Sequence, residues 1–96
     1  MFVLNPSRGA ARFRPMPHYY FNIYDSEVTM DHEGLELPSD ETAIARATVE
    51  VRSLAAGNVL DGHFAGWHWV EIRDADGRQT GTVRFDEAVT VQLESA

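Results

Sequence analysis

WHWVEIRDADGRQTGTVRF, residues 67–85, is the most informative stretch of the chain, because its pattern is that of a β-hairpin. Residues 67–73 are rich in aromatic and β-branched side chains, which favour strands. Residues 74–77 form a turn in which Gly77 can adopt a positive φ, and residues 79–85 are the returning strand. This hairpin predicts a small antiparallel sheet, and it contains no recognisable catalytic centre.

Further strands are predicted on both sides of the hairpin. Residues 18–24 form a strand with Tyr19, Phe21 and Ile23 on one face and Tyr20 and Tyr24 on the other. Residues 28–30 return as a second strand, and residues 35–37 are a short extension of alternating apolar and polar residues. Residues 89–93, with the sequence VTVQL, also alternate and predict a fifth strand.

One helix is predicted between the two groups of strands. Ser39 is a suitable N-cap, and the acidic residues Asp40 and Glu41 follow it in the first turn, where the helix dipole favours them. An apolar stripe has helical spacing and consists of Ile44, Ala47, Val51, Leu54 and Ala55. We expect the helix to end at residues 57–58, with a left-handed residue there. The predicted fold class is α+β, a four- or five-stranded antiparallel sheet with one helix packed on one face, in the order ββ-α-ββ(β).

The length of 96 residues allows one domain, and the charges are unevenly placed along it. Residues 1–15 carry three arginines and no acid (+3), whereas residues 16–96 carry five arginines and 15 acids (−10), which gives the total of −7. We expect residues 1–15 to be a disordered basic arm, or an extended start with Met16 as the natural first residue. Residues 16–96 are then the single small α+β domain.

Composition also excludes several classes of function. There are no cysteines, which excludes disulfides, thiolate zinc sites and a cysteine nucleophile. A domain at −10 repels phosphate backbones, so nucleic acid is not an expected partner. No apolar run is long enough to span a bilayer and the N-terminus has no apolar signal region, so we expect no membrane association and a cytoplasmic location.

Five short segments together point to a known family. They are MPHYYF (16–21), DHEGLELP (31–38), LDG (60–62), VEIRDADG (70–77) and VRFDEA (83–88). Through these segments the chain, from Met16 to about Leu93, resembles a family of short alphaproteobacterial proteins classed as a domain of unknown function. The resemblance implies a free-standing domain starting near Met16, and it implies no activity, cofactor or catalytic residue. Trp67, Trp69 and the spacer at residues 62–66 depart from the shorter, polar link that is typical of the family.

Histidines and acids are the candidates for metal or ligand chemistry. His18, His63 and His68, with nearby acids, form the hypothesis of a small ligand- or metal-binding protein, provided that the strands bring them together. The acids of residues 25–33 and 74–77 suit a calcium ion in type, although turns explain both segments, because Asp bonds to local backbone. No cofactor and no catalytic constellation is predicted, so the chain is not expected to be an enzyme.

The aromatic residues give the leading functional hypothesis. If the helix covers Val70 and Ile72, then Trp67 and Trp69 lie on the opposite face of the sheet, as do Tyr20 and Tyr24. In the alternative register the tryptophans belong to the core. The first arrangement predicts a small non-enzymatic interaction domain whose partner is a second copy, as a homodimer, or another protein, bound through this aromatic face or an edge strand.

Overall fold

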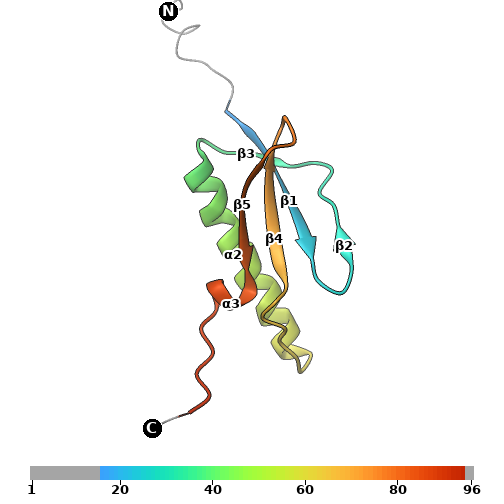
Figure 1. The fold of residues 1–96 in the computed structure, drawn as a ribbon, viewed down its shortest axis with the longest axis vertical. Helices are drawn as coiled ribbons and strands as arrows, with labels where there is room; N and C mark the ends of the chain where they lie inside the picture. The colour runs from blue at the N-terminus through green and yellow to red at the C-terminus, as the bar shows by residue number, and fades with distance from the viewer. Residues whose placement is uncertain (1–15, 95–96) are drawn as a thin grey trace, which may run out of the picture.

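The computed structural model describes residues 16–94, which form an antiparallel sheet with one long helix packed on one side. The strands are β1 (His18–Tyr24), β2 (Val28–Thr29), β3 (Leu35–Glu36), β4 (Trp69–Asp74) and β5 (Gln79–Arg84). The helices are α2 (Asp40–Leu60) and the single-turn α3 (Phe85–Ala88). Figure 1 shows the sheet in front of α2, and the predicted α+β fold class is confirmed. The predicted arm at residues 1–15 lies outside the described residues.

The sheet is built on the central pair β1 and β4. Its strand order is β2-β1-β4-β5. Strand β3 also pairs with β1: β3 pairs with the first residues of β1, and β2 pairs with the last. The β1–β4 ladder runs from the pair Tyr19 and Asp74 to the pair Tyr24 and Trp69. The predicted hairpin of β4 and β5 is present, with a register shift between Ile72 and Arg73, and Gly77 adopts a φ of 83° in its turn.

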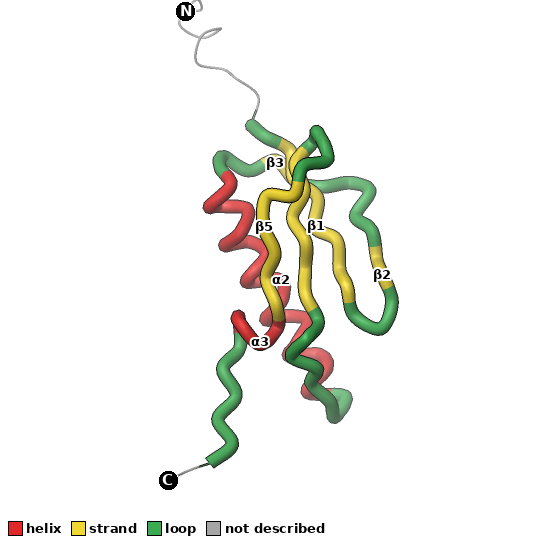
Figure 2. Tube along the Cα trace, in the orientation of Figure 1, coloured by secondary structure: helices red, strands yellow, loops and turns green. Residues whose placement is uncertain are grey.

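The expectation of a strand at residues 89–93 is wrong. Residues 90–94 have no strand structure, and the five strands arise because β2 and β3 are separate partners of β1. The reason lies in α3, which follows β5 directly and directs the chain away from the sheet, as the tube in Figure 2 shows. An alternating pattern forms a strand only where backbone partners are within reach.

Helix α2 begins as predicted and ends later than predicted. Ser39 Oγ accepts a hydrogen bond from the Thr42 backbone N–H at 3.1 Å, which is an N-cap. The helix passes through Gly57 and ends at Leu60, and the left-handed residue after it is Gly62, with a φ of 95°. A glycine on an exposed helix position weakens the helix without stopping it, so Gly57 alone was a poor end signal.

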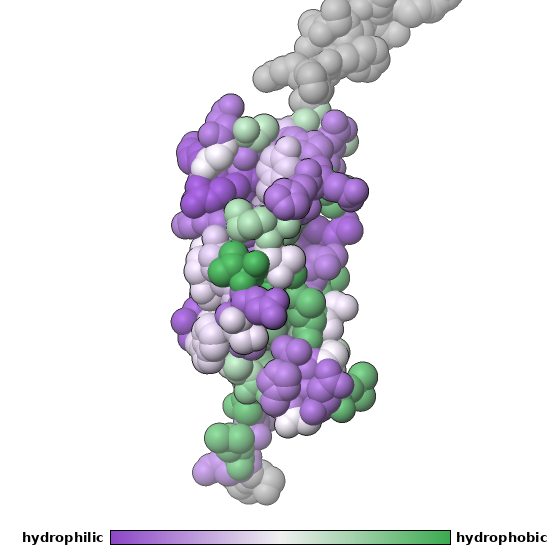
Figure 3. Space-filling view, turned by 90° about the vertical axis from the view of Figure 1, so that its right-hand side faces the viewer, coloured by the Kyte–Doolittle hydropathy of each residue, from purple (hydrophilic) through white to green (hydrophobic). Residues whose placement is uncertain are grey.

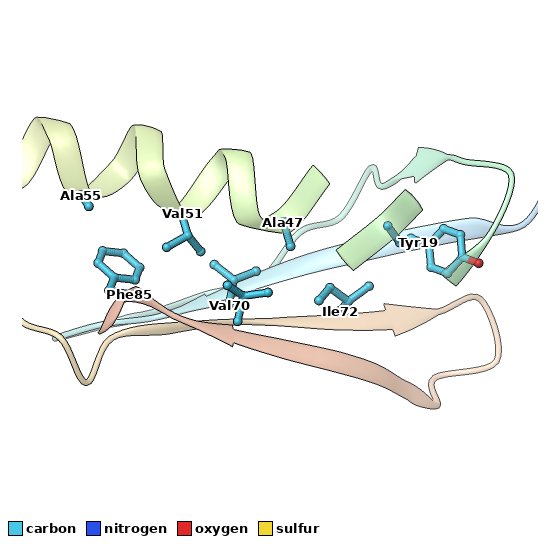
Figure 4. Packing of buried hydrophobic residues seen from close by; sticks show 9 residues of the cluster. Tyr19, Ala47, Val51, Ala55, Val70, Ile72 and Phe85 are labelled. Atoms are coloured by element: carbon cyan, nitrogen blue, oxygen red, sulfur yellow. The ribbon is translucent and has the colours of Figure 1, made fainter. Parts of the chain in front are cut away.

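The core lies between α2 and the sheet, as Figure 4 shows. The helix contributes residues spaced four apart, namely Ala43, Ala47, Val51 and Ala55. The stripe predicted from the sequence included Ile44, which is instead partly exposed and packs over Gly81 of β5. Small alanine side chains at the contact allow the helix to lie close to the strands.

A hydrogen bond joins the start of the sheet to the start of the helix. Tyr19 is buried in the core, and its hydroxyl donates to Asp40 Oδ1 at 2.7 Å. The hydrogen bond to the Asp40 carboxylate, together with burial, raises the pKa of Tyr19 to about 12. None of the helices in the described part of the chain has the length and apolar content needed to cross a membrane.

Candidate functional site

The face of the sheet opposite α2 is the candidate site. Val70, Ile72 and Val83 are buried in the core under α2, so the alternation of the strands turns their neighbours to the opposite side. Within the described residues no helix covers that side, because α2 passes behind the strands in Figure 1 and α3 packs at the end of β5. We call it the open face, and its residues are Tyr20, Asn22, Tyr24, Trp69, Glu71, Arg73, Thr82 and Arg84.

Two aromatic rings stack at one end of the open face. Tyr24 and Trp69 are directly paired across β1 and β4, and their ring centroids lie 4.1 Å apart with an interplanar angle of 5°. The Tyr24 hydroxyl also donates a hydrogen bond to Glu71 Oε1 at 3.2 Å. Burial first, and then the negative charge of Glu71, raise the pKa of Tyr24. The stack is therefore held in place by packing and by a polar contact.

Glu71 is a buried carboxylate at the centre of the open face, with an exposed fraction of 3%. Its Oε2 lies 2.8 Å from Arg73 Nη2, and its Oε1 accepts hydrogen bonds from Asn22 Nδ2 and the Tyr24 hydroxyl. Burial raises the pKa of Glu71, but the bonds from Arg73, Asn22 and Tyr24 outweigh it, so the pKa is below its ordinary value. The charge is thus kept and compensated within the sheet.

The network continues into the loop between β2 and β3. Asn22 Oδ1 accepts from the Asp31 backbone N–H at 2.9 Å, and Asp31 Oδ2 accepts from the Phe21 N–H at 3.1 Å. Asp31 Oδ1 accepts from the N–H groups of Glu33 and Gly34, both at 3.0 Å. The Asp31 side chain therefore forms a hydrogen bond with the backbone of β1 at Phe21, a residue that pairs with neither β2 nor β3.

The structure separates the four predicted interface residues into two places. Tyr20, Tyr24 and Trp69 lie on the open face, and the Tyr20 ring is 5.1 Å from that of His18. Trp67 precedes β4, which begins at Trp69 and not at residue 67 as expected. Trp67 is 53% exposed, and its ring lies roughly perpendicular to that of His68, with 4.4 Å between the ring centroids, instead of joining the stack.

The hypothesis of a site formed by His18, His63 and His68 is wrong for a geometric reason. Because β1 and β4 are antiparallel, His18, the first residue of β1, lies at one end of their ladder, and His68, which precedes β4, lies at the other. His18 Nε2 is bonded to the Glu33 carbonyl at 2.7 Å, and the buried His68 ring contacts Phe85. In residues 16–94 no group of three or more His, Asp or Glu side chains converges on a metal position.

The two acidic segments are turns, as expected from local bonding. Asp25 Oδ1 accepts from the Glu27 N–H, and Asp74 Oδ1 accepts from the N–H groups of Asp76 and Arg78. The Arg78 and Asp76 backbone bonds to Asp74 keep the pKa of that carboxyl below its ordinary value. These carboxylates stabilise loop backbone.

Sequence reasoning missed the polar centre of the open face. Asn22, Glu71 and Arg73 alternate with core residues, so the pleat placed them on the aromatic side, but only the register shows that Asn22 and Glu71 are direct partners. The signal available in the sequence was Asn22, a polar residue between Tyr20 and Tyr24 on the strand face that no helix was expected to cover. The arrangement places two half-buried aromatic rings and a partly exposed arginine side chain on the open face.

Comparison with known proteins gives a family and one distant relative. A family model described as "Domain of unknown function (DUF6894)" matches residues 18–86, which confirms the resemblance noted from the sequence. A maltose epimerase from Levilactobacillus brevis is 28% identical over 91 residues, which cover 90% of this chain. Those residues cover 26% of the epimerase, so the chain spans about a quarter of that relative's length. No solved structure matches the chain.

Proposed function

The chain belongs to the family described as a domain of unknown function (DUF6894), and we propose that it is a small non-enzymatic interaction domain. Its partner in this proposal is a second copy of itself, bound through the open face as a homodimer. The observation that carries the proposal is the stacked pair Tyr24 and Trp69, ordered by the buried Glu71 on a sheet face with no helix over it. A cytoplasmic location remains part of the same proposal.

The composition of the open face supports a role in protein binding. Tyrosine, tryptophan and arginine are the residue types that most often contribute strongly to interface energies, and the open face presents Tyr20, Tyr24, Trp69 and Arg73. Rings that are already held by stacking lose little side-chain entropy when a partner covers them. The face is therefore suited to binding without a large ordering cost.

Charge favours a second copy as the occupant. The chain has a net charge of −7, so most of its surface repels another copy. By contrast, the charges of the open face are paired: Glu71 is paired with Arg73, and Arg84 is paired at 2.7 Å with Asp86 of the adjoining α3. These four charges cancel, so two open faces can approach each other without net repulsion.

Solution mass tests the proposal directly. We expect the wild-type chain to exceed the monomer mass in light scattering, and Trp69→Ala to weaken association by about tenfold or more, since an aromatic hot spot is worth over 1.4 kcal/mol. Trp67→Ala is the matched control, because Trp67 is exposed and lies outside the stack. It should leave the mass unchanged.

A second variant separates binding from folding. Thr82 is exposed and lies directly across from Glu71, so Thr82→Arg adds bulk to the open face without touching the core. We expect this variant to keep the wild-type circular dichroism spectrum and to lose association. A monomeric wild-type chain, or an unchanged mass for folded Trp69→Ala and Thr82→Arg, contradicts the proposal.

A further inference from the structure

A second apolar surface lies at one end of the molecule, away from the centre of the open face. Figure 1 shows the C-terminal end of α2, the loop before β4 and the chain after α3 at the same lower end. Of the ten large hydrophobic residues that are exposed in the described part of the chain, four belong to the first and third of these segments, namely Val59, Leu60, Val91 and Leu93. Exposed hydrophobic residues gathered at one end of a molecule make that end a candidate interaction surface.

A groove crosses this end. It has a volume of about 450 Å³ and is lined by Arg52, Ala55, Ala56, Val59, Leu60, Phe64 and Val89. All of these except Arg52 are apolar, and Arg52 lies at the groove with its Nε donating to the Ala88 carbonyl at 2.8 Å. The groove is therefore suited to an extended apolar segment with a negative charge at one end.

Residues 89–93, which we call the C-terminal segment, have these properties. Val89, Val91 and Leu93 alternate with polar residues, and Glu94 follows them. Among the described residues, the segment's backbone N–H groups make one hydrogen bond, from Val89 to the Phe85 carbonyl. Leu93 is 92% exposed, and Figure 3 shows hydrophobic side chains of this segment projecting beyond the body.

The C-terminal segment does not fill its own groove. Val89 forms part of the groove wall, and from there the chain leads away from the body in Figure 1. To turn back, the segment would need a tight reversal directly after Val89, yet it contains no glycine or proline. A second copy can take up the segment in the extended form that it already has.

We propose that the part of the C-terminal segment beyond Val89 in one copy lies in the groove of a second copy, while Val89 stays in the wall of its own groove, and that the second copy reciprocates. The lengths agree, because the groove follows α2 from Arg52 to Leu60, about 12 Å at 1.5 Å per residue, and the extended chain from Thr90 to Glu94 spans about 13 Å. Glu94 then brings a negative charge to a groove whose charged lining residue is Arg52. Reciprocal exchange gives a closed two-fold contact.

This contact goes beyond the open-face dimer and does not depend on it. Cross-linking tests it cleanly, because the chain has no cysteine of its own. Leu60 and Leu93 are 88% and 92% exposed, so Leu60→Cys and Leu93→Cys leave the core intact. The two single variants are mixed in equal amounts, oxidised mildly and analysed by mass spectrometry.

We expect the mixed disulfide between the Leu60→Cys and Leu93→Cys chains to dominate, well above the half share that random collisions produce. Val49→Cys is the control partner for the Leu93→Cys chain, because Val49 lies on α2 outside the groove. That mixture should give only the random distribution. A random distribution for the first mixture as well overturns the proposal.

Two other arrangements have distinct products. A disulfide of the Leu93→Cys chain with a Thr82→Cys chain, in preference to Leu60→Cys, places the segment on the open face at β5 and overturns its place in the groove. A double variant with Leu60→Cys and Leu93→Cys that oxidises mainly within one chain shows the segment in its own groove, and it also overturns the proposal. Mixed disulfides between two chains support it.

A non-covalent comparison separates this contact from the open-face dimer. Val49 and Val59 are both on α2 and both 59% exposed, so Val49→Asp and Val59→Asp are a matched pair. We expect Val59→Asp, but not Val49→Asp, to reduce the mixed disulfide and to weaken association by about tenfold, since a buried unpaired charge costs more than 1.4 kcal/mol. If Trp69→Ala weakens association and Val59→Asp does not, the copies bind through the open face, and the proposed exchange of C-terminal segments is overturned. If Val59→Asp weakens association and Trp69→Ala does not, the exchange of segments is supported and the open-face dimer is contradicted.

Discussion

Gly34 is a residue whose replacement should be costly, because its backbone has a φ of 70° in the turn before β3. A Cβ atom there would lie 2.6 Å from both His18 Nε2 and the Tyr19 carbonyl oxygen. The ring can move, but the carbonyl belongs to the paired strand β1 and cannot move freely. We expect Gly34→Ala to lower the free energy of unfolding by about 2 kcal/mol or more, measured by urea denaturation.

Gly57→Ala is the matched control for that experiment. Gly57 lies inside α2, and a Cβ atom there would meet nothing within 4 Å. Alanine is the better helix former, so we expect a gain of about 0.5–1 kcal/mol in the free energy of unfolding. Equal effects of the two substitutions would show that the position of Gly34 imposes no special requirement.

Asp31 should make the stability of the fold depend on pH. Burial raises the pKa of its carboxyl, but the backbone N–H groups of Gly34, Phe21 and Glu33 outweigh burial and leave the pKa below its ordinary value. The unfolded chain therefore binds the proton more readily than the folded chain does. The stabilising contribution is full above the unfolded pKa of about 3.9 and is lost as the pH falls through the folded pKa.

We expect Asp31→Asn to lower the free energy of unfolding by about 1–3 kcal/mol at neutral pH, because it weakens three bonds to backbone N–H groups. The difference from the wild type should shrink as the pH is lowered from about 5 to about 2, since the wild-type carboxyl is then also neutral. Thermal melts over this range measure it. A difference that stays constant with pH would show that the charge of Asp31 is unimportant.

Helix α2 depends on small side chains where it crosses the sheet. Ala47 is fully buried between the helix and the strands, as Figure 4 shows, whereas Ala45 on the same helix is exposed. We expect Ala47→Leu to lower the free energy of unfolding by about 1–3 kcal/mol, because the extra carbons have no space in the packed layer. Ala45→Leu should change it by less than about 0.5 kcal/mol.

Chemical denaturation of the two leucine variants measures this difference. A similar small effect for both would mean that α2 can move away from the sheet without cost. The comparison also tests why the helix stripe read from the sequence was incomplete. Ile44 has the hydrophobicity of a core residue, but the crossing position selects Ala43 and Ala47, because only small side chains fit there.

Self-association should make the stability of the whole molecule depend on protein concentration. If copies bind only in the folded state, the melting temperature rises with concentration by mass action. We expect this rise for the wild-type chain and a smaller rise for Thr82→Arg, whose substitution lies on the open face. Calorimetry over a wide concentration range measures it, and a melting temperature independent of concentration would contradict both contacts between copies.

The candidate site was predictable in part. Alternation along residues 18–24 separated Tyr19 from Tyr20 and Tyr24, because side chains of a strand alternate between its faces. The stack of Tyr24 on Trp69 and the pairing of Asn22 with Glu71 follow from the β1–β4 register, which joins residues 49 positions apart in the second case. No local pattern specifies a register between such distant segments.

Local chemistry was sufficient for the hairpin of β4 and β5, the strand β1, the N-cap at Ser39 and the resemblance to a family. The hairpin, the strand and the cap each depend mainly on the backbone preferences of neighbouring residues, and the resemblance depends on short stretches of sequence. Tertiary packing decided the rest: the end of α2, the absence of a strand at residues 89–93, the separation of His18 from His68, and the buried Glu71. These features depend on which distant backbone groups and side chains are within reach, and that is settled only when the sheet assembles against the helix.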